Sequence, residues 1–124
     1  MPKALIAIMS ARSDKTSTAQ GLRMFTVLYR WIIAPDQAQD FISGWEAVTD
    51  HFIEHHGALG SRLHRVADNT FAAYAQWRSR EARAAAFAAN DAPEAAVEKM
   101  NRAIVDRLEP IEMGVVSDRL IDVS

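Results

Sequence analysis

The sequence predicts an α+β domain whose elements follow the order strand, helix, strand, strand, helix, strand. Two observations carry this prediction most directly: an alternating apolar run over residues 24–33, and a segment, residues 72–87, in which an aromatic strand ends at a tryptophan and a serine-capped helix begins. The order βαββαβ is the split βαβ plan of ferredoxin-like domains with an antiparallel sheet. With 124 residues the chain has room for one such domain.

The first strand, residues 24–33, has two different faces. Its even positions mix polar and apolar side chains, whereas its odd positions are all apolar. Successive residues of a strand point to opposite faces, so one face is fully apolar and the other only partly so. We therefore expect helices to cover one face and a second subunit to cover the other. The odd positions are Phe25, Val27, Tyr29, Trp31 and Ile33.

An amphipathic helix follows this strand. Asp36 and Gln39 form a capping-box pattern at its expected start, and Gly57 marks its expected end. Between them, apolar residues recur at three- and four-residue steps, which places them on one helical face. These residues are Phe41, Trp45, Val48 and Phe52.

A hairpin and a helix fill the middle of the chain. Strands over residues 61–66 and 71–77 are joined by Asp68 and Asn69, which are typical of tight turns. The serine that opens residues 79–89 is expected to cap a helix there.

The last part of the chain predicts one more helix and one strand. Asp91, Pro93 and Glu94 are typical of a helix start, and the apolar spacing extends this helix to about Leu108. Residues 111–123 then form the final strand. Together these elements predict a domain over residues 24–124.

Residues 1–23 differ from the rest of the chain. The apolar run over residues 4–9 is too short for a signal-peptide core or a membrane span. Residues 10–21 are polar and read as a linker. We expect an N-terminal extension, either a linker or an added edge strand, that the domain does not need for folding.

Composition excludes several classes of function. The formal net charge of −2 and the pI of about 6.1 show no basic excess, so we expect neither a nucleic acid nor a membrane as partner. The sequence has no cysteine, which excludes disulfides, thiolate zinc sites and a cysteine nucleophile. A cytoplasmic location is the expectation that follows.

From Met24 to about Val116 the sequence resembles the antibiotic biosynthesis monooxygenase family. The matching segments are FTVLYR (25–30), HGALG (56–60), LHR (63–65) and YAQW followed by SREA (74–82). The resemblance implies a dimeric α/β barrel, in which two sheets pack face to face and each subunit has a pocket between sheet and helices. Some members oxidise phenolic substrates with dioxygen and no cofactor, and relatives degrade haem.

The resemblance also implies a site for a hydrophobic or aromatic small molecule. Trp77 matches the tryptophan of the family pattern and would position the substrate, while Tyr29 or a histidine at the pocket rim would assist proton transfer. Tyr29 and Trp77 are the expected catalytic residues. Each also suits a plain core, because large aromatic residues are commonly buried in either role. The expected substrate-binding residues are Trp31, Leu63, Phe71, Ala73, Phe87 and His55.

Three positions depart from the family pattern. Ala73 stands where monooxygenase members commonly have Asn. Tyr29 stands where haem-degrading relatives have Asn, and Phe87 stands where they have the axial His, so haem degradation is disfavoured. Ala73 and Phe87 favour a non-catalytic domain, whereas the retained Trp77 favours an enzyme. A cofactor-independent monooxygenase is the expected function, and a non-catalytic small-molecule-binding or interaction domain is the alternative.

Two further groups of residues are candidates for a metal site or for binding an anion. His51 and His55 stand four apart on the first helix, a spacing that can hold a metal, but histidines near a helix C-terminus are expected from the helix dipole alone. We therefore predict no metal site. Arg83 is expected on the surface of its helix, and the alternative is that it reaches a carboxylate or phenolate. The homodimer is expected to form through the partly apolar sheet face, which carries Leu28, Arg30, Ile32, Tyr74 and Gln76.

Overall fold

The computed structural model of the chain describes residues 24–121. The predicted extension over residues 1–23 and the end of the predicted last strand, residues 122–124, lie outside the described residues. The elements are β1 (Phe25–Ile33), α2 (Ala38–His56), β2 (Gly60–Ala67), β3 (Thr70–Trp77), α3 (Arg80–Ala89), α4 (Glu94–Ala103), β4 (Ile104–Arg107) and β5 (Ile111–Gly114).

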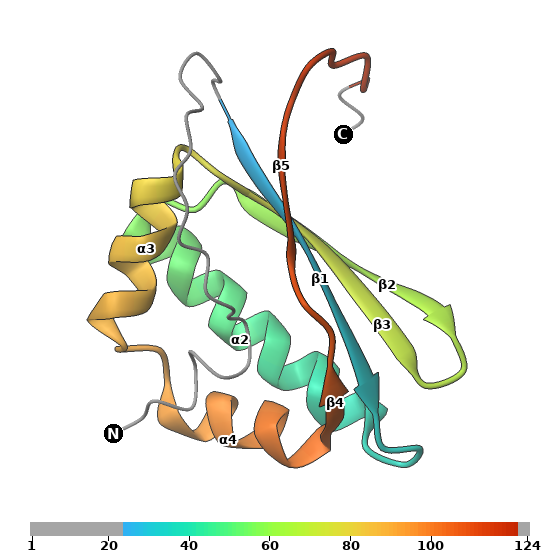
Figure 1. Cartoon of the computed structure of the whole chain (residues 1–124). Coiled ribbons are helices and arrows are strands. Elements are labelled where there is room, and N and C mark those ends of the chain that lie inside the picture. Colours follow the sequence, from blue (N-terminus) through green and yellow to red (C-terminus); the bar gives the residue numbers. More distant parts are fainter. Residues whose placement is uncertain (1–23, 122–124) are drawn as a thin grey trace.

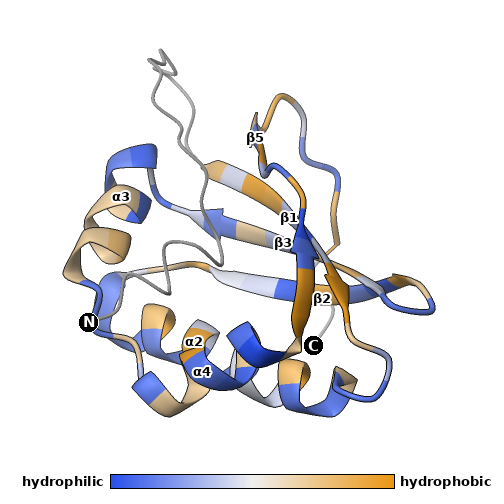
Figure 2. Cartoon of the chain, turned by 60° about the horizontal axis from the view of Figure 1, so that its bottom comes forward, coloured by the Kyte–Doolittle hydropathy of each residue, from blue (hydrophilic) through white to orange (hydrophobic). Residues whose placement is uncertain are grey.

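One antiparallel sheet organises the domain. Its strands lie in the order β2-β3-β1-β4, and β5 also pairs with β1 (Figure 1). This is the order of a ferredoxin-like sheet, and the predicted α+β fold class is confirmed. The helices α2, α3 and α4 all lie on one side of the sheet (Figure 2). No helix within residues 24–121 is both long and apolar enough to span a membrane.

The hydrophobic core lies between the helices and one face of the sheet. Every odd-numbered residue of β1 is buried, as the alternation predicts, and so is every residue of the predicted stripe on α2. From β3 the same core receives Phe71, Ala73, Ala75 and Trp77. The opposite sheet face has no helix over it within the described residues, and its side chains on β1 and β3 are mostly half-buried.

The helices α2 and α4 approach closely at Gly44. A β-carbon at this position would lie 2.7 Å from the backbone oxygen of Ala96 and 2.9 Å from Cγ of Met100. Only a residue without a side chain allows this distance between the two helices.

Two predicted helix signals are confirmed and one is wrong. The hydroxyl of Ser79 accepts a 3.0 Å hydrogen bond from the backbone N–H of Ala82, and α2 ends at Gly57, whose φ is 72°. Asp36 does not cap α2. It lies in a turn that the N–H of Gln37 closes on Ala34, so the helix begins too late for the Asp36 carboxylate to reach it.

The predicted boundary between the last helix and the last strand is also wrong. The helix α4 ends at Ala103 instead of continuing to Leu108, because residues 104–107 pair with the end of β1 as β4. Ile104 and Val105 are β-branched and suit this position beside β1. The predicted strand over residues 111–123 is shortened to β5, and residues 115–121 form no strand.

The strands β4 and β5 act as two halves of one edge. β4 pairs with the Trp31–Ile33 end of β1 and β5 pairs with its Phe25–Leu28 end. Between them, the N–H of Leu108 donates a 3.0 Å hydrogen bond to the carbonyl of Arg30. The pairing along this edge is interrupted between β4 and β5, where Pro110 has no N–H to donate.

Candidate functional site

A small pocket lies between the sheet and the C-terminal half of α2. Its volume is ≈ 20 Å³, which is room for about one water-sized group. Five of its lining residues are half-buried and keep some contact with solvent: Thr49, Ala58, Gly60, Ser61 and Gln76. The full lining consists of Tyr29, Trp45, Thr49, Phe52, Ala58, Gly60, Ser61, Ala75, Gln76 and Trp77.

Two buried polar atoms of the pocket-lining residues have no hydrogen-bond partner within residues 24–121. They are the indole nitrogen Nε1 of Trp77 and the hydroxyl oxygen Oγ of Ser61, and both are buried. A buried donor without a partner costs about 1–3 kcal/mol, so native proteins rarely leave one unused. The two groups are therefore suited to hydrogen-bond a polar atom of a ligand.

The hydroxyl of Tyr29 is the third polar group at the pocket. It accepts a 2.8 Å hydrogen bond from Nε of Arg83, and the two residues are 3% and 8% exposed. Burial raises the pKa of Tyr29, although the charge and hydrogen bond of Arg83 oppose the rise. The N–H of Trp77 also opposes it, but its geometry falls short of a hydrogen bond. Tyr29 is therefore neutral at physiological pH and can donate its own proton to a ligand.

Arg83 is held in place from two further sides, and the prediction that it lies on the surface is wrong. Its guanidinium carbon lies 4.6 Å from the ring centroid of Phe87, and its Nη1 lies 3.9 Å from Glu112. Glu112 also pairs with Arg80 at 2.7 Å. Arg83 shares the inner face of α3 with Ala86 and Phe87, three and four residues later, which is why α3 carries it into the core.

Trp77 belongs to an aromatic cluster that forms one wall of the pocket. Its ring centroid lies 5.4 Å from that of Phe52 and 6.2 Å from that of Phe87, and those two rings stack at 5.5 Å. Trp77 was expected either in the core or in the pocket lining, and its side chain belongs to both. Phe87 packs behind this wall and is not part of the lining.

Of the remaining expected site residues, none lines the pocket. Trp31 and Phe71 pack around Phe41, with centroid distances of 5.0 and 5.6 Å. Ala73 lies between Tyr29 and Leu63 in the register of the sheet, fully buried beneath the helices. The structure therefore brings together Tyr29 and Trp77 and leaves these four in the neighbouring core.

His55 lies away from the pocket. Its side chain is 59% exposed and its Nε2 lies 3.7 Å from the Glu54 carboxylate. Ser61 and Thr49 are polar lining residues that the sequence did not indicate as site residues. The register of the hairpin offers a signal for Ser61, because it pairs with the small, inward-facing Ala75.

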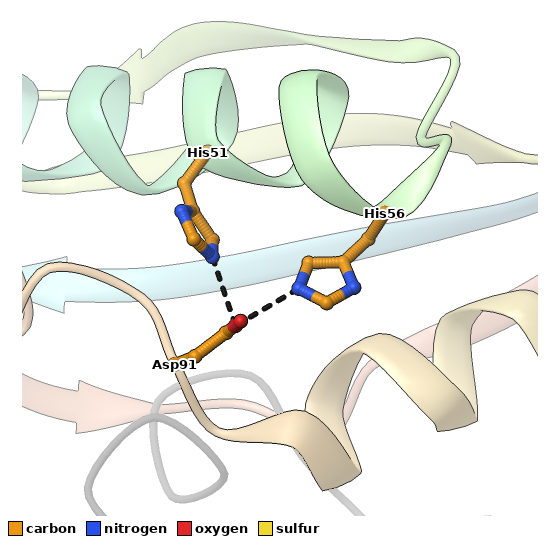
Figure 3. A group of neighbouring side chains, drawn as sticks. All are labelled: His51, His56 and Asp91. Atoms are coloured by element: carbon orange, nitrogen blue, oxygen red, sulfur yellow. Dashed lines mark hydrogen bonds and ion pairs between the residues drawn. The ribbon is translucent and has the colours of Figure 1, made fainter.

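A second cluster joins His51, His56 and Asp91. The two histidines lie at the C-terminal end of α2, and Asp91 lies between α3 and α4 (Figure 3). Nε2 of His51 and Nε2 of His56 lie 2.8 and 2.9 Å from the same oxygen, Oδ1 of Asp91. The hydrogen bond from His51, and then that from His56, holds the pKa of Asp91 at about 2. Asp91 was expected only at a helix start, and the pair weighed for a metal was His51 with His55.

The chain was compared with family models, with curated proteins and with solved structures, and a family model matches it. The family model for antibiotic biosynthesis monooxygenase matches residues 24–99. A search among curated proteins finds no match. The family match covers β1 through most of α4 and includes both Tyr29 and Trp77.

Solved structures with this fold come from several bacteria. A proposed antibiotic biosynthesis monooxygenase from Chloroflexus aurantiacus is 16% identical, with a TM-score of 0.65 over 80% of this chain and 99% of that one. One from Nitrosomonas europaea is 14% identical, with a TM-score of 0.66 over 80% and 96%. SnoaB, a cofactor-independent oxygenase from Streptomyces nogalater, is 17% identical, with a TM-score of 0.61 over 77% and 96%. At these identities the likeness shows the fold.

Proposed function

Because the chain belongs to the antibiotic biosynthesis monooxygenase family, we propose that it is a cofactor-independent monooxygenase that oxidises an aromatic or quinol-like small molecule with dioxygen. The observation that carries the proposal is the set of polar groups at one apolar pocket. Tyr29, Trp77 and Ser61 all line it, and within residues 24–121 the indole N–H of Trp77 and the hydroxyl of Ser61 have no hydrogen-bond partner.

These groups suit the activation of a phenolic substrate. Hydrogen bonds from Trp77 and Ser61 to the substrate oxygen stabilise its anionic form, which is the form that gives an electron to dioxygen. Tyr29 stays protonated and acts as a donor, with the positive charge of Arg83 behind it. Such preorganised donors act more strongly at a mostly apolar pocket than in water.

The electrons for the reaction come from the substrate itself. In an anthrone-type substrate, the anion transfers one electron to dioxygen, and the substrate radical and superoxide combine at the ring carbon as a hydroperoxide after proton uptake. Loss of water from the hydroperoxide leaves a carbonyl. The balance is one CH₂ group and one O₂ giving one C=O group and one H₂O, so the step needs no external reductant.

The size of the pocket favours a second candidate. A volume of ≈ 20 Å³ admits one oxygen-sized group, whereas an aromatic ligand needs a site of about 300 Å³ or more. Substrate entry therefore requires side chains such as Trp45 and Gln76 to move. If they do not move, the chain is a non-catalytic binding or interaction domain of the same fold.

We further propose a homodimer that forms through the helix-free face of the sheet, and a cytoplasmic location. Supporting the dimer, this face carries half-buried Leu28 and Tyr74, and a groove of ≈ 790 Å³ runs along it beside residues 113–120. That partly apolar surface is suited to burial against a second copy.

Oxygen consumption tests the enzymatic proposal. The purified full-length chain is assayed in an oxygen electrode against a panel of hydroquinones and anthrones, with no flavin or iron added. We expect Trp77→Phe to change KM and kcat together, and Ser61→Ala to raise KM. Tyr29→Phe should mainly lower kcat, because its hydroxyl acts on the developing charge. Tyr74→Phe removes the second tyrosine hydroxyl, which lies on the opposite sheet face, and should leave both constants unchanged.

Two outcomes separate the candidates. Turnover above the buffer rate that falls in Trp77→Phe and Tyr29→Phe supports the monooxygenase. Binding of an aromatic compound without oxygen uptake supports the binding domain. No turnover with any compound, or variants that all match the wild type, contradicts the enzymatic proposal.

A further inference from the structure

The cluster of His51, His56 and Asp91 has the composition of a metal site. Two imidazole nitrogens and one carboxylate oxygen are ligands that Zn²⁺ and similar divalent ions accept, as in sites with two histidines, one carboxylate and an open position. The structure brings the three together from α2 and from the segment between α3 and α4, and Figure 3 shows all three side chains pointing toward one another.

The distances within the cluster suit one ion. One ligand atom from each residue lies within 4.8 Å of the other two. Bonds of about 2.0–2.2 Å to a tetrahedral ion place its ligands roughly 3.5 Å apart. Nε2 of each histidine now lies 2.8 or 2.9 Å from Asp91, so a small outward movement of this carboxylate makes room for the ion.

The side chains of the two histidines are mostly buried, whereas the carboxylate of Asp91 is accessible to solvent. The side chains of His51 and His56 are 14% and 17% exposed, whereas that of Asp91 is 50% exposed. Both histidine rings pack near Phe52, with centroid distances of 6.2 and 6.1 Å. The two nitrogen ligands are therefore already oriented, and an ion can reach them from the solvent side past Asp91.

The charge of the cluster also favours a cation. Metal-bound imidazoles are neutral and a metal-bound carboxylate is ionised, so the three ligands together offer one negative charge to the ion. Imidazole ligands select transition metals over Mg²⁺ and Ca²⁺, which prefer oxygen. The sequence has no cysteine and four histidines, so no thiolate site elsewhere in the chain competes for the ion.

We propose that His51, His56 and Asp91 bind one divalent transition-metal ion of the Zn²⁺ type, with at least one coordination position open to solvent or a ligand. The ion would replace the hydrogen bonds that now link the histidines to Asp91, and it would join the end of α2 to the segment between α3 and α4. None of the three ligands lines the pocket beside Trp77, so the metal site is separate from the proposed oxidation site.

Zinc binding by the full-length chain tests the proposal. The protein carries no histidine tag, is treated with a chelator and dialysed, and is then titrated with Zn²⁺ against a competing metal indicator. We expect one ion per chain. We expect His51→Ala, His56→Ala and Asp91→Asn each to weaken binding by about tenfold or more, since loss even of groups behind the ligands costs about that much.

Two histidine variants are matched controls. His55→Ala removes the neighbouring ring on α2, and His64→Ala removes the exposed histidine of β2; both should bind Zn²⁺ like the wild type. Saturating Zn²⁺ should also raise the melting temperature of the wild type and of both controls, because an ion that binds only the folded chain stabilises it. The rise should be absent in Asp91→Asn.

A measurement on the wild type alone guards against variants that fail to fold. One equivalent of Co²⁺ should give the intense visible absorption of a low-coordinate site with nitrogen and oxygen ligands, and Zn²⁺ should remove it by displacement. The proposal is overturned if no ion binds at one per chain, if His55→Ala or His64→Ala lowers affinity as much as the ligand variants, or if Co²⁺ shows only its weak six-coordinate spectrum.

Discussion

Nε of Arg83 on α3 donates a 2.8 Å hydrogen bond to the hydroxyl of Tyr29 on β1, across 54 positions of sequence. Both side chains are buried and have little access to water, so each satisfies a polar group of the other. The contact ties α3 to the central strand of the sheet. It also partly offsets the rise that burial causes in the pKa of Tyr29.

The ionisation of Tyr29 gives a pH prediction. Its folded-state pKa lies above the ordinary value of 10.0 because burial disfavours the phenolate. The stability that this provides is fully present below pH 10 and is lost as the pH rises through the folded-state pKa. An ultraviolet titration of tyrosinate should therefore show a component above pH 10 that disappears in Tyr29→Phe. Loss of that component in Tyr74→Phe instead would contradict the assignment.

Replacement of Arg83 should destabilise the fold more than replacement of Arg80. Arg83→Met leaves the buried Tyr29 hydroxyl without its donor and should lower the free energy of unfolding by about 2 kcal/mol. Arg80→Met removes an ion pair with Glu112 that is about one third exposed, and should cost less than about 1 kcal/mol. Urea unfolding of both variants measures the difference. Equal losses would show that the burial of Arg83 has no energetic consequence.

Gly44→Ala tests the close contact of α2 with α4. Alanine favours an isolated helix by about 1 kcal/mol over glycine, so helix propensity alone predicts stabilisation. The added methyl would lie 2.7 Å from the backbone oxygen of Ala96, however, and the backbone cannot yield without separating the helices. We expect a net loss of about 1–3 kcal/mol, measured by thermal or urea unfolding.

Glu46→Ala is the control for this variant. Glu46 is exposed on the same helix, and its replacement should change stability by less than about 0.5 kcal/mol. An unchanged or more stable Gly44→Ala protein would mean that the two helices lie farther apart than described.

The oligomeric state tests the proposed use of the helix-free sheet face. Sedimentation at micromolar concentration should give a dimer for the wild type and a monomer for Tyr74→Glu, because the new charge would be buried between two sheets. Ile53→Glu introduces the same charge on the exposed side of α2 and should remain a dimer. A monomeric wild type, or a dimer that only Ile53→Glu disrupts, contradicts the face-to-face arrangement.

Local patterns in the sequence predict much of the fold. The alternation in residues 24–33 predicts β1 and its buried face. Asp68 with Asn69 predicts the hairpin turn, and Ser79 and Gly57 mark helix ends where the structure has them. Each of these signals works because the residues that carry it lie within a few positions of the groups that they contact or cap.

The errors lie where other backbone hydrogen bonds, long-range in one case and local in the other, compete with a sequence pattern. The helical spacing through Leu108 is a real local pattern, but residues 104–107 gain backbone hydrogen bonds to β1 by leaving the helix. Asp36 matches a capping box, but the turn at Ala34 delays the helix beyond its reach. In both cases the hydrogen bonds of a neighbouring segment outweigh a preference of a few tenths of a kcal/mol per residue.

The sequence by itself determined most of the order of the elements, because that order follows from residue type and short spacing, and its resemblance to a known family indicated the family that the family model confirms. Tyr29 and Trp77 line the pocket, and their catalytic roles stay predictions. Only the tertiary structure decided that Arg83 is buried against Tyr29 and that Asp91 meets His51 and His56 across 40 and 35 positions. Such contacts depend on how the packed layers bring separate elements together. No short stretch of sequence contains that information, since the sheet register and the helix packing that produce it arise only when the whole core is buried.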